Sequence, residues 1–258
     1  GDWLQIDAFE LLHKSFGGSG FDLLQSIKNT RDGGFILAGT SSSCQGGQKK
    51  DSCKGNTDFW VIKLDAAGNE QWQKTIGGSG QDELVCAFQT RDGGYILGGS
   101  SSSSPSIIKK DNPNEKKVLD TKPDLYGKSE KSRGNMDYWI VKLDINGVVQ
   151  WQKTYGGTGS DKAESIQQTA DGGYIIMCTS NSNNGDVTDN HGNYDYWVVK
   201  TDATGNIIWQ KSYGGTSIEN GREIKQTVDG GYIMIGQSYS NNGDVTGNHG
   251  NYDYWVVK

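Results

Sequence analysis

Short apolar runs separated by glycine-rich turns recur along the chain and predict a β protein. Residues 165–213 contain four such runs in succession: SIQQT, YIIMC, DYWVVKTD and IIWQKSY. The first two are joined by ADGG and the last two by ATGN, and both linkers have the composition of tight hairpin turns. Each repeat of this kind is therefore expected to form four short antiparallel strands.

The third run is apolar on both of its faces. In DYWVVK, Tyr196 and Val198 point to one side of a strand, while Trp197 and Val199 point to the other. Such a strand needs cover on both sides, which is typical of a sheet packed between two neighbouring sheets, as in the blades of a β-propeller. No segment has long helical periodicity.

The same pattern occurs four times in register. A GG pair is followed fifteen residues later by a DGG triplet, then by an aromatic pair with an apolar tail, and in three copies by WQK. The markers are Gly17, Gly77, Gly156 and Gly214 for GG; Asp32, Asp92, Asp171 and Asp229 for DGG; Trp60, Trp139, Trp197 and Trp255 for the aromatic pair; and Trp72, Trp151 and Trp209 for WQK. Four copies in register predict a repeat architecture with one sheet per copy.

The two ends of the sequence predict how the sheets close into a ring. The fourth copy reaches only its third strand at Lys258, and residues 8–18, AFELLHKSFGG, align with the fourth-strand segment IIWQKSYGG, with Leu12 in the Trp position. We therefore predict an all-β, four-bladed β-propeller of four-stranded antiparallel blades, closed by the N-terminal strand. The alternative is an open fragment of a larger propeller. Residues 1–258 are expected to form a single domain with repeats at about 19–78, 79–157, 158–215, and 216–258 plus 8–18.

These motifs resemble a known group of proteins. WQK-x-[YI]-GG, QT-x-DGGYI and DYWVVK-x-D are similar to repeats in secreted and surface proteins of Bacteroidetes, many of which carry a C-terminal sorting domain for type nine secretion. The resemblance covers residues 8–258 and implies a propeller-like fold and a secreted or cell-surface location. It implies little about the ligand, and residues 1–258 do not include a segment that resembles the sorting domain, so the route of export is not predicted.

Composition and charge exclude several classes of function. The chain has 38 Gly but only 3 Pro, with 8 Trp and 12 Tyr, which favours many tight turns between strands over disorder. A net charge of −6 argues against a nucleic-acid binder, which would need a basic face. No apolar run is long enough to span a bilayer.

The four cysteines fall into two kinds. Cys44 and Cys53 lie in the polar loop SSSCQGGQKKDSCKG and are predicted to form a disulfide, which implies an oxidising compartment; the alternative is two exposed thiols. Cys86 and Cys178 lie inside apolar strands and are expected to be buried as small hydrophobic residues.

Function is expected on the loops between the second and third strands, which vary in length while the opposite turns do not. In copies three and four these loops read SNSNNGDVTDNHGNYD and SYSNNGDVTGNHGNYD, and their oxygen ligands suit calcium. The candidate metal ligands are Asn183, Asp186, Asp195, Asn241, Asp244 and Asp253. The alternative is that Asn-Gly turns and side-chain-to-backbone bonds order the loops.

Aromatic, imidazole and carboxylate groups of the same region are candidates for binding a glycan. The predicted ligand-binding residues are Tyr194, Tyr252, Tyr239, His191, His249, Asp82 and Asp161. The two aspartates belong to a series of acids that follow each GG pair by five: Asp22, Asp82, Asp161 and Glu219. These acids could line a central channel or cap their own turns.

The sequence predicts an extracellular or cell-surface binding module for a glycan or a surface protein. The alternatives are a structural or scaffold subunit of a surface assembly and a polysaccharide hydrolase or lyase. No catalytic residue is predicted, because no nucleophile–His–acid set or phosphate-binding loop is present. The isolated domain is expected to be monomeric or part of a larger assembly. The locally basic insertion 101–135 is either a solvated loop or an electrostatic arm for an acidic partner.

Overall fold

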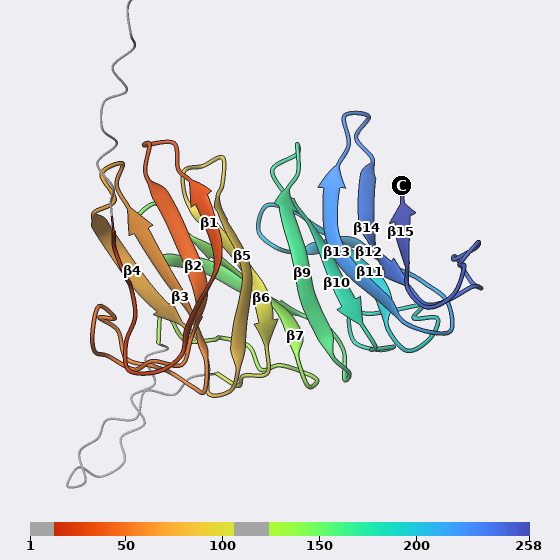
Figure 1. The fold of residues 1–258 in the computed structure, drawn as a ribbon, viewed down its shortest axis with the longest axis horizontal. Coiled ribbons are helices and arrows are strands. Elements are labelled where there is room, and N and C mark those ends of the chain that lie inside the picture. The colour runs from red at the N-terminus through yellow and green to blue at the C-terminus, as the bar shows by residue number, and fades with distance from the viewer. Residues whose placement is uncertain (1–12, 106–123) are drawn as a thin grey trace, which may run out of the picture.

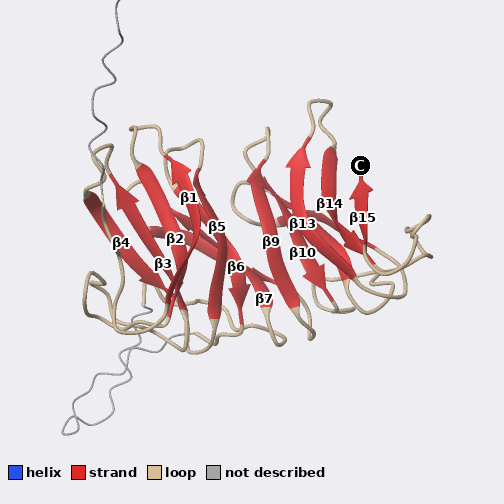
Figure 2. Cartoon of the chain, viewed as in Figure 1, coloured by secondary structure: helices blue, strands red, loops and turns tan. Residues whose placement is uncertain are grey.

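The computed structural model describes residues 13–105 and 124–258, which form fifteen strands and no helix (Figures 1 and 2). The strands are β1 (Asp22–Asn29), β2 (Phe35–Ser41), β3 (Asp58–Leu64), β4 (Glu70–Ile76), β5 (Asp82–Gln89), β6 (Tyr95–Ser101), β7 (Asp137–Leu143), β8 (Val149–Tyr155), β9 (Asp161–Gln168), β10 (Tyr174–Ser180), β11 (Asp195–Thr201), β12 (Ile207–Tyr213), β13 (Glu219–Gln226), β14 (Tyr232–Ser238) and β15 (Asp253–Val257). Within these ranges no helix is present that could cross a membrane.

Each repeat forms its own antiparallel sheet, as the sequence predicts. Sheet one is β1–β4, sheet two β5–β8, sheet three β9–β12 and sheet four β13–β15. The DGG triplets make the predicted hairpin turns between the first and second strands. In sheet two, the Thr90 amide donates to the Gly94 carbonyl at 2.9 Å, and Gly93 adopts a φ of 89°, which favours glycine.

The sheets stack face to face along a curve (Figure 1). The first strand of each sheet packs on the middle of the sheet before it: β5 on β2, β9 on β6, and β13 on β10. The third strands of sheets one to three are buried on both faces, as expected from their sequences. Aromatic rings meet across the junctions, with ring centroids 4.8 Å apart for Phe59 and Trp139 and 4.7 Å apart for Tyr196 and Trp255.

The described residues do not form the predicted closed ring. They form an open arc in which sheet four has three strands and β15 pairs with β14 (Figure 1). The predicted closing segment, 8–18, is described from residue 13 onward. There Lys14 Nζ donates to the Gly68 carbonyl at 2.5 Å, and Phe16 packs on the cluster around Trp60. Residues 13–18 thus lie against sheet one and do not complete sheet four.

The physical reason is that matching sequence ends identify a strand type but not the angle between successive sheets. That angle sets how many sheets are needed to close a ring. Here four sheets span only an arc, so the first and last sheets lie at its opposite ends (Figure 1).

The cysteines behave largely as predicted. Cys44 and Cys53 form a disulfide within the loop of sheet one. Cys178 is fully buried between sheets two and three, and Cys86 packs against the same cluster while staying half-buried.

Two tyrosines at equivalent positions test whether stacking stabilises the sheets. Tyr196 is covered by sheet four, whereas Tyr254 has no sheet over it. We expect Tyr196→Ala to lower the free energy of unfolding by about 3–5 kcal/mol and Tyr254→Ala by less than about 0.5 kcal/mol, both in dilute protein. Urea titration followed by tryptophan fluorescence measures both. Equal losses would contradict the stacking account.

Candidate functional site

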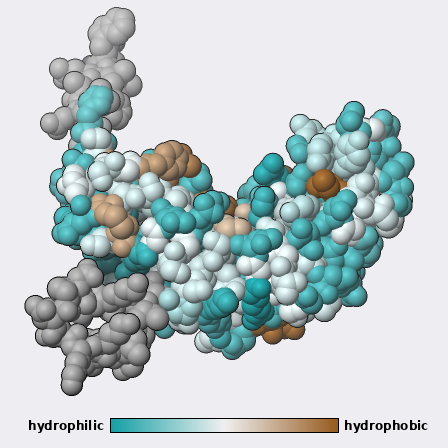
Figure 3. Space-filling view, turned by 90° about the horizontal axis from the view of Figure 1, so that it is seen from below, coloured by the Kyte–Doolittle hydropathy of each residue, from teal (hydrophilic) through white to brown (hydrophobic). Residues whose placement is uncertain are grey.

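The long loops and the GG links share one edge of the stack, which we call the loop edge. It comprises loops 42–57, 102–136, 181–194 and 239–252 and links 17–21, 77–81, 156–160 and 214–218; residues 106–123 lie outside the described ranges. Parallel bridges pair Thr57 with Gln81, Met136 with Ser160, and Tyr194 with Ile218, so each loop contacts the next link. Figure 3 looks onto this edge, whose described surface is mostly hydrophilic.

Asp82 and Asp161 lie under the GG links and have the geometry of caps. Asp161 Oδ2 accepts hydrogen bonds from the Gly157 amide and the Ser182 hydroxyl, both at 2.8 Å, and Oδ1 accepts one from Ser180. Asp82 Oδ2 likewise accepts from the Gly78 amide at 2.6 Å. Both aspartates are fully buried. These carboxylates hold their own links, which favours the capping interpretation over a channel-lining one.

A second acid at each junction faces the first. Asp137 accepts from the Arg133 amide at 2.5 Å and lies across Gly156 from Asp161. A Cβ on Gly156 would lie 2.9 Å from Asp137 Oδ1 and 2.5 Å from Asp161 Oδ2, so glycine is required between the two carboxylates. Burial, reinforced by the neighbouring Asp161 charge, raises the pKa of Asp137 to about 6.

The same pairing recurs at the other two junctions. Burial, together with the charge of Asp82, raises the pKa of Asp58 to about 6. Burial also raises the pKa of Asp195, whose neighbour is Glu219. Because two close carboxylates cannot both ionise without cost, these pairs favour the protonated form of one member.

Buried lysines accompany the acids in sheets one and two. Lys49 Nζ lies 5.5 Å from the centroid of the Trp60 ring and donates to Ser41 Oγ at 2.7 Å. Lys128 Nζ lies 5.0 Å from the Trp139 ring and donates to Thr154 Oγ1 at 2.8 Å. Burial lowers the pKa of Lys128 to about 8 although Asp82 and Asp137 oppose the shift. The part of the basic insertion that the structure describes thus includes one packed lysine, Lys128, and one exposed lysine, Lys131.

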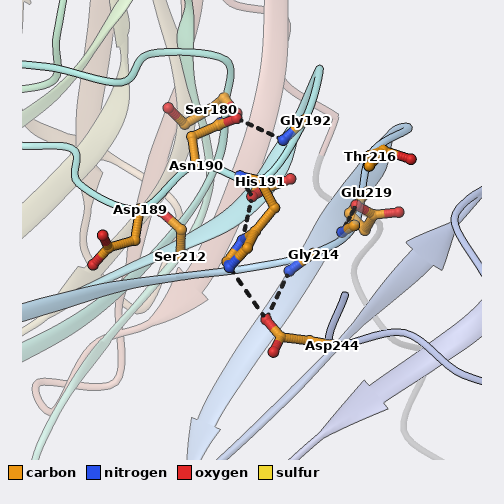
Figure 4. Close-up of polar contacts among 12 residues, drawn as sticks. Ser180, Asp189, Asn190, His191, Gly192, Ser212, Gly214, Thr216, Glu219 and Asp244 are labelled. Carbon is orange, nitrogen blue, oxygen red and sulfur yellow. Dashed lines mark hydrogen bonds and ion pairs between the residues drawn. The ribbon is translucent and has the colours of Figure 1, made fainter. Parts of the chain in front are cut away.

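His191 joins two neighbouring loops (Figure 4). Its amide and its Nδ1 contact Asp195 Oδ2 at 2.6 and 2.9 Å, and its Nε2 lies 4.0 Å from Asp244 Oδ2. Asp244 Oδ2 also accepts from the Gly214 amide at 3.2 Å. One junction earlier, Arg133 takes the equivalent position and pairs with Asp186. At both junctions a basic side chain of one loop therefore faces an acid of the next loop.

The candidate metal ligands are distributed among separate local contacts. Asp186 accepts from the Gly156 amide at 3.2 Å, and Asp253 accepts from the His249 amide at 2.7 Å. Asn241 Oδ1 accepts from the Gly247 amide at 3.1 Å, while Asn183 is exposed. Within the described ranges no three His, Cys, Asp or Glu side chains are placed to share a metal ion. Each of these hydrogen bonds orders its own loop, as the alternative interpretation expects.

The predicted aromatic residues divide between exposed and half-buried positions. Tyr239 and Tyr252 are exposed and contact each other edge to face, with ring centroids 5.3 Å apart. Tyr194 is half-buried, and its carbonyl accepts from the Glu219 amide at 2.6 Å. His249 is exposed beside Asp253. Among the predicted ligand residues, the exposed side chains are therefore those of Tyr239, Tyr252, His191 and His249. The His191 ring also contacts Asp195.

Comparison with protein-family models and with curated proteins finds no match for this chain.

Sequence reasoning missed the packed lysines and the second row of acids. Each third strand opens with the acid of a DFW or DYW motif, but only Asp195 and Asp253 are among the predicted site residues; the four acids are Asp58, Asp137, Asp195 and Asp253. Lys49 and Lys128 lie in loops of different length, so nothing in the aligned motifs marks them as equivalent.

The paired acids predict an unusual dependence of stability on pH. Because folding raises the pKa of Asp58 and Asp137 to about 6, the native state holds protons that the unfolded chain releases between about pH 4 and 6. Their contribution to stability, on the order of 1–3 kcal/mol each, is therefore complete below about pH 4 and falls as pH rises to about 6. Asp32 behaves oppositely: Lys63 lowers its pKa to about 2, so its contribution is lost only as pH falls toward 2.

Asp137→Asn should flatten the pH 4–6 slope, since the amide resembles the protonated acid. Urea unfolding at several pH values measures the slope, and Glu83→Gln, at an exposed carboxylate, is the control. A variant profile that matches the wild-type profile would contradict the role of the acid pairs.

Proposed function

We propose that this chain is a scaffold segment of an extracellular surface assembly. The observation that carries the proposal is that the loop edge uses its polar groups to join one sheet to the next. Arg133 of sheet two pairs with Asp186 of sheet three, and the Asp82 and Glu219 amides donate to the carbonyls of Thr57 and Tyr194 in the sheet before. Groups with these contacts position the sheets, and binding a ligand would require breaking them.

The stack itself supports a structural role. Side-chain packing and backbone bridges repeat at each of the three junctions, which suits a stiff segment. We further propose that the open arc is a section of a propeller-like or related repeat array, in keeping with the alternative that the sequence left open. The Cys44–Cys53 disulfide supports an oxidising, and hence extracellular, location.

Glycan binding is the second candidate, and the Tyr239–Tyr252 pair favours it. Two exposed rings in edge-to-face contact offer a surface on which a sugar ring can stack. A hydrolase or lyase has less support, because it required Asp82 and Asp161 to converge from separate blades, and each instead binds its own link.

The scaffold proposal predicts that small ligands leave the protein unchanged. The melting temperature should be the same with EDTA and with added Ca²⁺, since a ligand of the native state would raise it. A glycan array should show no saturable binding. The competing result is a glycan signal that is lost in Tyr252→Ala and kept in Tyr126→Ala, a control at a half-buried tyrosine of loop 102–136, with both variants folded. That result would replace the scaffold function by glycan recognition.

A further inference from the structure

The outer face of sheet four is apolar and uncovered. Tyr254 is 91% exposed and Val256 56% exposed. The equivalent positions of sheets one to three hold Phe59 and Val61, Tyr138 and Ile140, and Tyr196 and Val198, all 0% exposed. In each of those sheets the next sheet covers this pair, so sheet four presents one half of an interface that the chain forms three times.

The outer face of sheet one presents the other half. Leu24 and Ile27 on β1 are 55% and 57% exposed. Leu84 and Ala87, at the same positions of β5, are 0% exposed because sheet one covers them. The two ends of the stack are therefore different surfaces. The face of sheet four matches the covered faces of sheets one to three, and the face of sheet one matches the faces that cover them.

A groove on sheet one fits the exposed ring of sheet four. It has a volume of about 320 Å³ and is lined by Phe16, Leu24, Leu37, Gly39 and Trp60 among others. At the first junction the equivalent space holds the Phe59 ring, which packs on Trp139 and lies over Gly99. A Cβ on Gly99 would come within 2.6 Å of that ring.

The third junction repeats this arrangement with the Tyr196 ring on Trp255 and Gly236. Gly39 and Trp60 are the corresponding pair in the groove, and Tyr254 is the corresponding ring.

A backbone hydrogen bond between neighbouring sheets also recurs along the stack, and its two partners are present at the two ends. At the internal junctions, the Asp82 amide donates to the Thr57 carbonyl at 3.0 Å and the Glu219 amide to the Tyr194 carbonyl at 2.6 Å. The next members of the series are the Asp22 amide on sheet one and the Tyr252 carbonyl on sheet four. A Cβ on Gly250 would meet nothing within 4 Å, whereas its equivalents Gly55, Gly134 and Gly192 each lie against the backbone of the following GG link.

The incomplete edge of sheet four adds a further contact. A groove of about 270 Å³, lined by Val245, His249 and Trp255 among others, lies beside β15. In sheet three the equivalent place is filled by the fourth strand, β12, which pairs with β11. There Gln210 Oε1 accepts a hydrogen bond from Trp197 Nε1 at 2.7 Å. Residues 13–16 lie against sheet one, at the position that the fourth strand of a preceding sheet would take. If sheet one of a second copy covered sheet four, residues 13–16 of that copy would lie beside β15 of the first.

On the basis of the scaffold function, we propose that two copies of this chain dock head to tail, with sheet one of the second copy covering the exposed face of sheet four of the first. The ring of Tyr254 enters the groove over Gly39 and packs on Trp60 of the second copy. Because the two faces differ, the contact is heterologous, and its repetition builds either a ring or a filament. Pairing of two sheet-four faces would leave the groove empty.

Self-association and its faces can be measured by sedimentation velocity. We expect the average mass of the wild-type chain to rise with concentration between about 1 and about 200 µM. Val256→Asp and Tyr254→Lys should each weaken association at least tenfold, because each places a charge in an apolar contact. Ile208→Asp is the matched control, since Ile208 is 58% exposed on β12 away from both end faces. A wild-type chain that stays monomeric, or a Val256→Asp chain that associates normally, overturns the proposal.

Mixing variants tests the head-to-tail geometry. Ile27→Lys blocks the sheet-one face and Val256→Asp the sheet-four face, so each alone should be monomeric. Their mixture keeps one intact face of each kind and should form a 1:1 heterodimer. Association of Ile27→Lys with itself, or no heterodimer in the mixture, overturns the proposal.

A cysteine pair distinguishes a second copy from closure within one chain. Phe21 and Tyr252 continue the series of parallel bridges that joins Tyr194 to Ile218. In the Phe21→Cys, Tyr252→Cys double variant, oxidation should link chains into a ladder on a non-reducing gel. A cross-link confined to one chain overturns the proposal.

If the wild-type chain is monomeric and binds no glycan, self-association is contradicted, but the scaffold function is not. A glycan signal lost in Tyr252→Ala removes the scaffold function whatever the mass.

Discussion

The structure depends on one constraint: a strand that is apolar on both faces must be covered on both faces. The third strand of every repeat is of this kind, so no sheet can be stable alone, and each sheet covers its neighbours in turn. Sheets two and three have a neighbour on each side, whereas sheets one and four have one each. The exposed apolar side chains at the two ends of the arc follow directly from this arrangement.

The polar groups at the loop edge solve a second problem, which is how to fix one sheet relative to the next. Apolar packing is not directional, but hydrogen bonds to a buried carboxylate are. Each GG link passes close to such carboxylates, and only glycine leaves room for them, as at Gly156. Buried acids in pairs destabilise their ionised forms, which is offset by backbone amides, serine hydroxyls and, in sheets one and two, a buried lysine.

Much of the fold could be predicted from the sequence because the same pattern of strands and turns occurs in four copies. The strand pattern, the DGG turns, the two-sided burial of Trp197 and its neighbours and the Cys44–Cys53 disulfide all follow from local chemistry. Ring closure did not follow. It depends on the angle between sheets, which arises from packing of many side chains and has no signature in a single motif.

The site was harder to predict because its residue types are ambiguous. Asp161 in a glycine-rich turn suits both a ligand and a cap, and only the positions of Gly157 and Ser182 show which contacts it makes. Lys128 belongs to a basic stretch that suggests solvent exposure, yet it is buried and its ammonium lies over the Trp139 ring. Such distinctions depend on contacts between distant segments.

The most direct test of two-sided cover is amide hydrogen exchange of the third strands, read by mass spectrometry at low and high protein concentration. At low concentration, the account predicts slow exchange in β7 and β11 and fast exchange in β15, which has one face and one edge uncovered. As the concentration rises, β15 and β1 should gain protection while β7 and β11 stay unchanged. Equal protection of β15 and β11 in dilute solution would contradict the account.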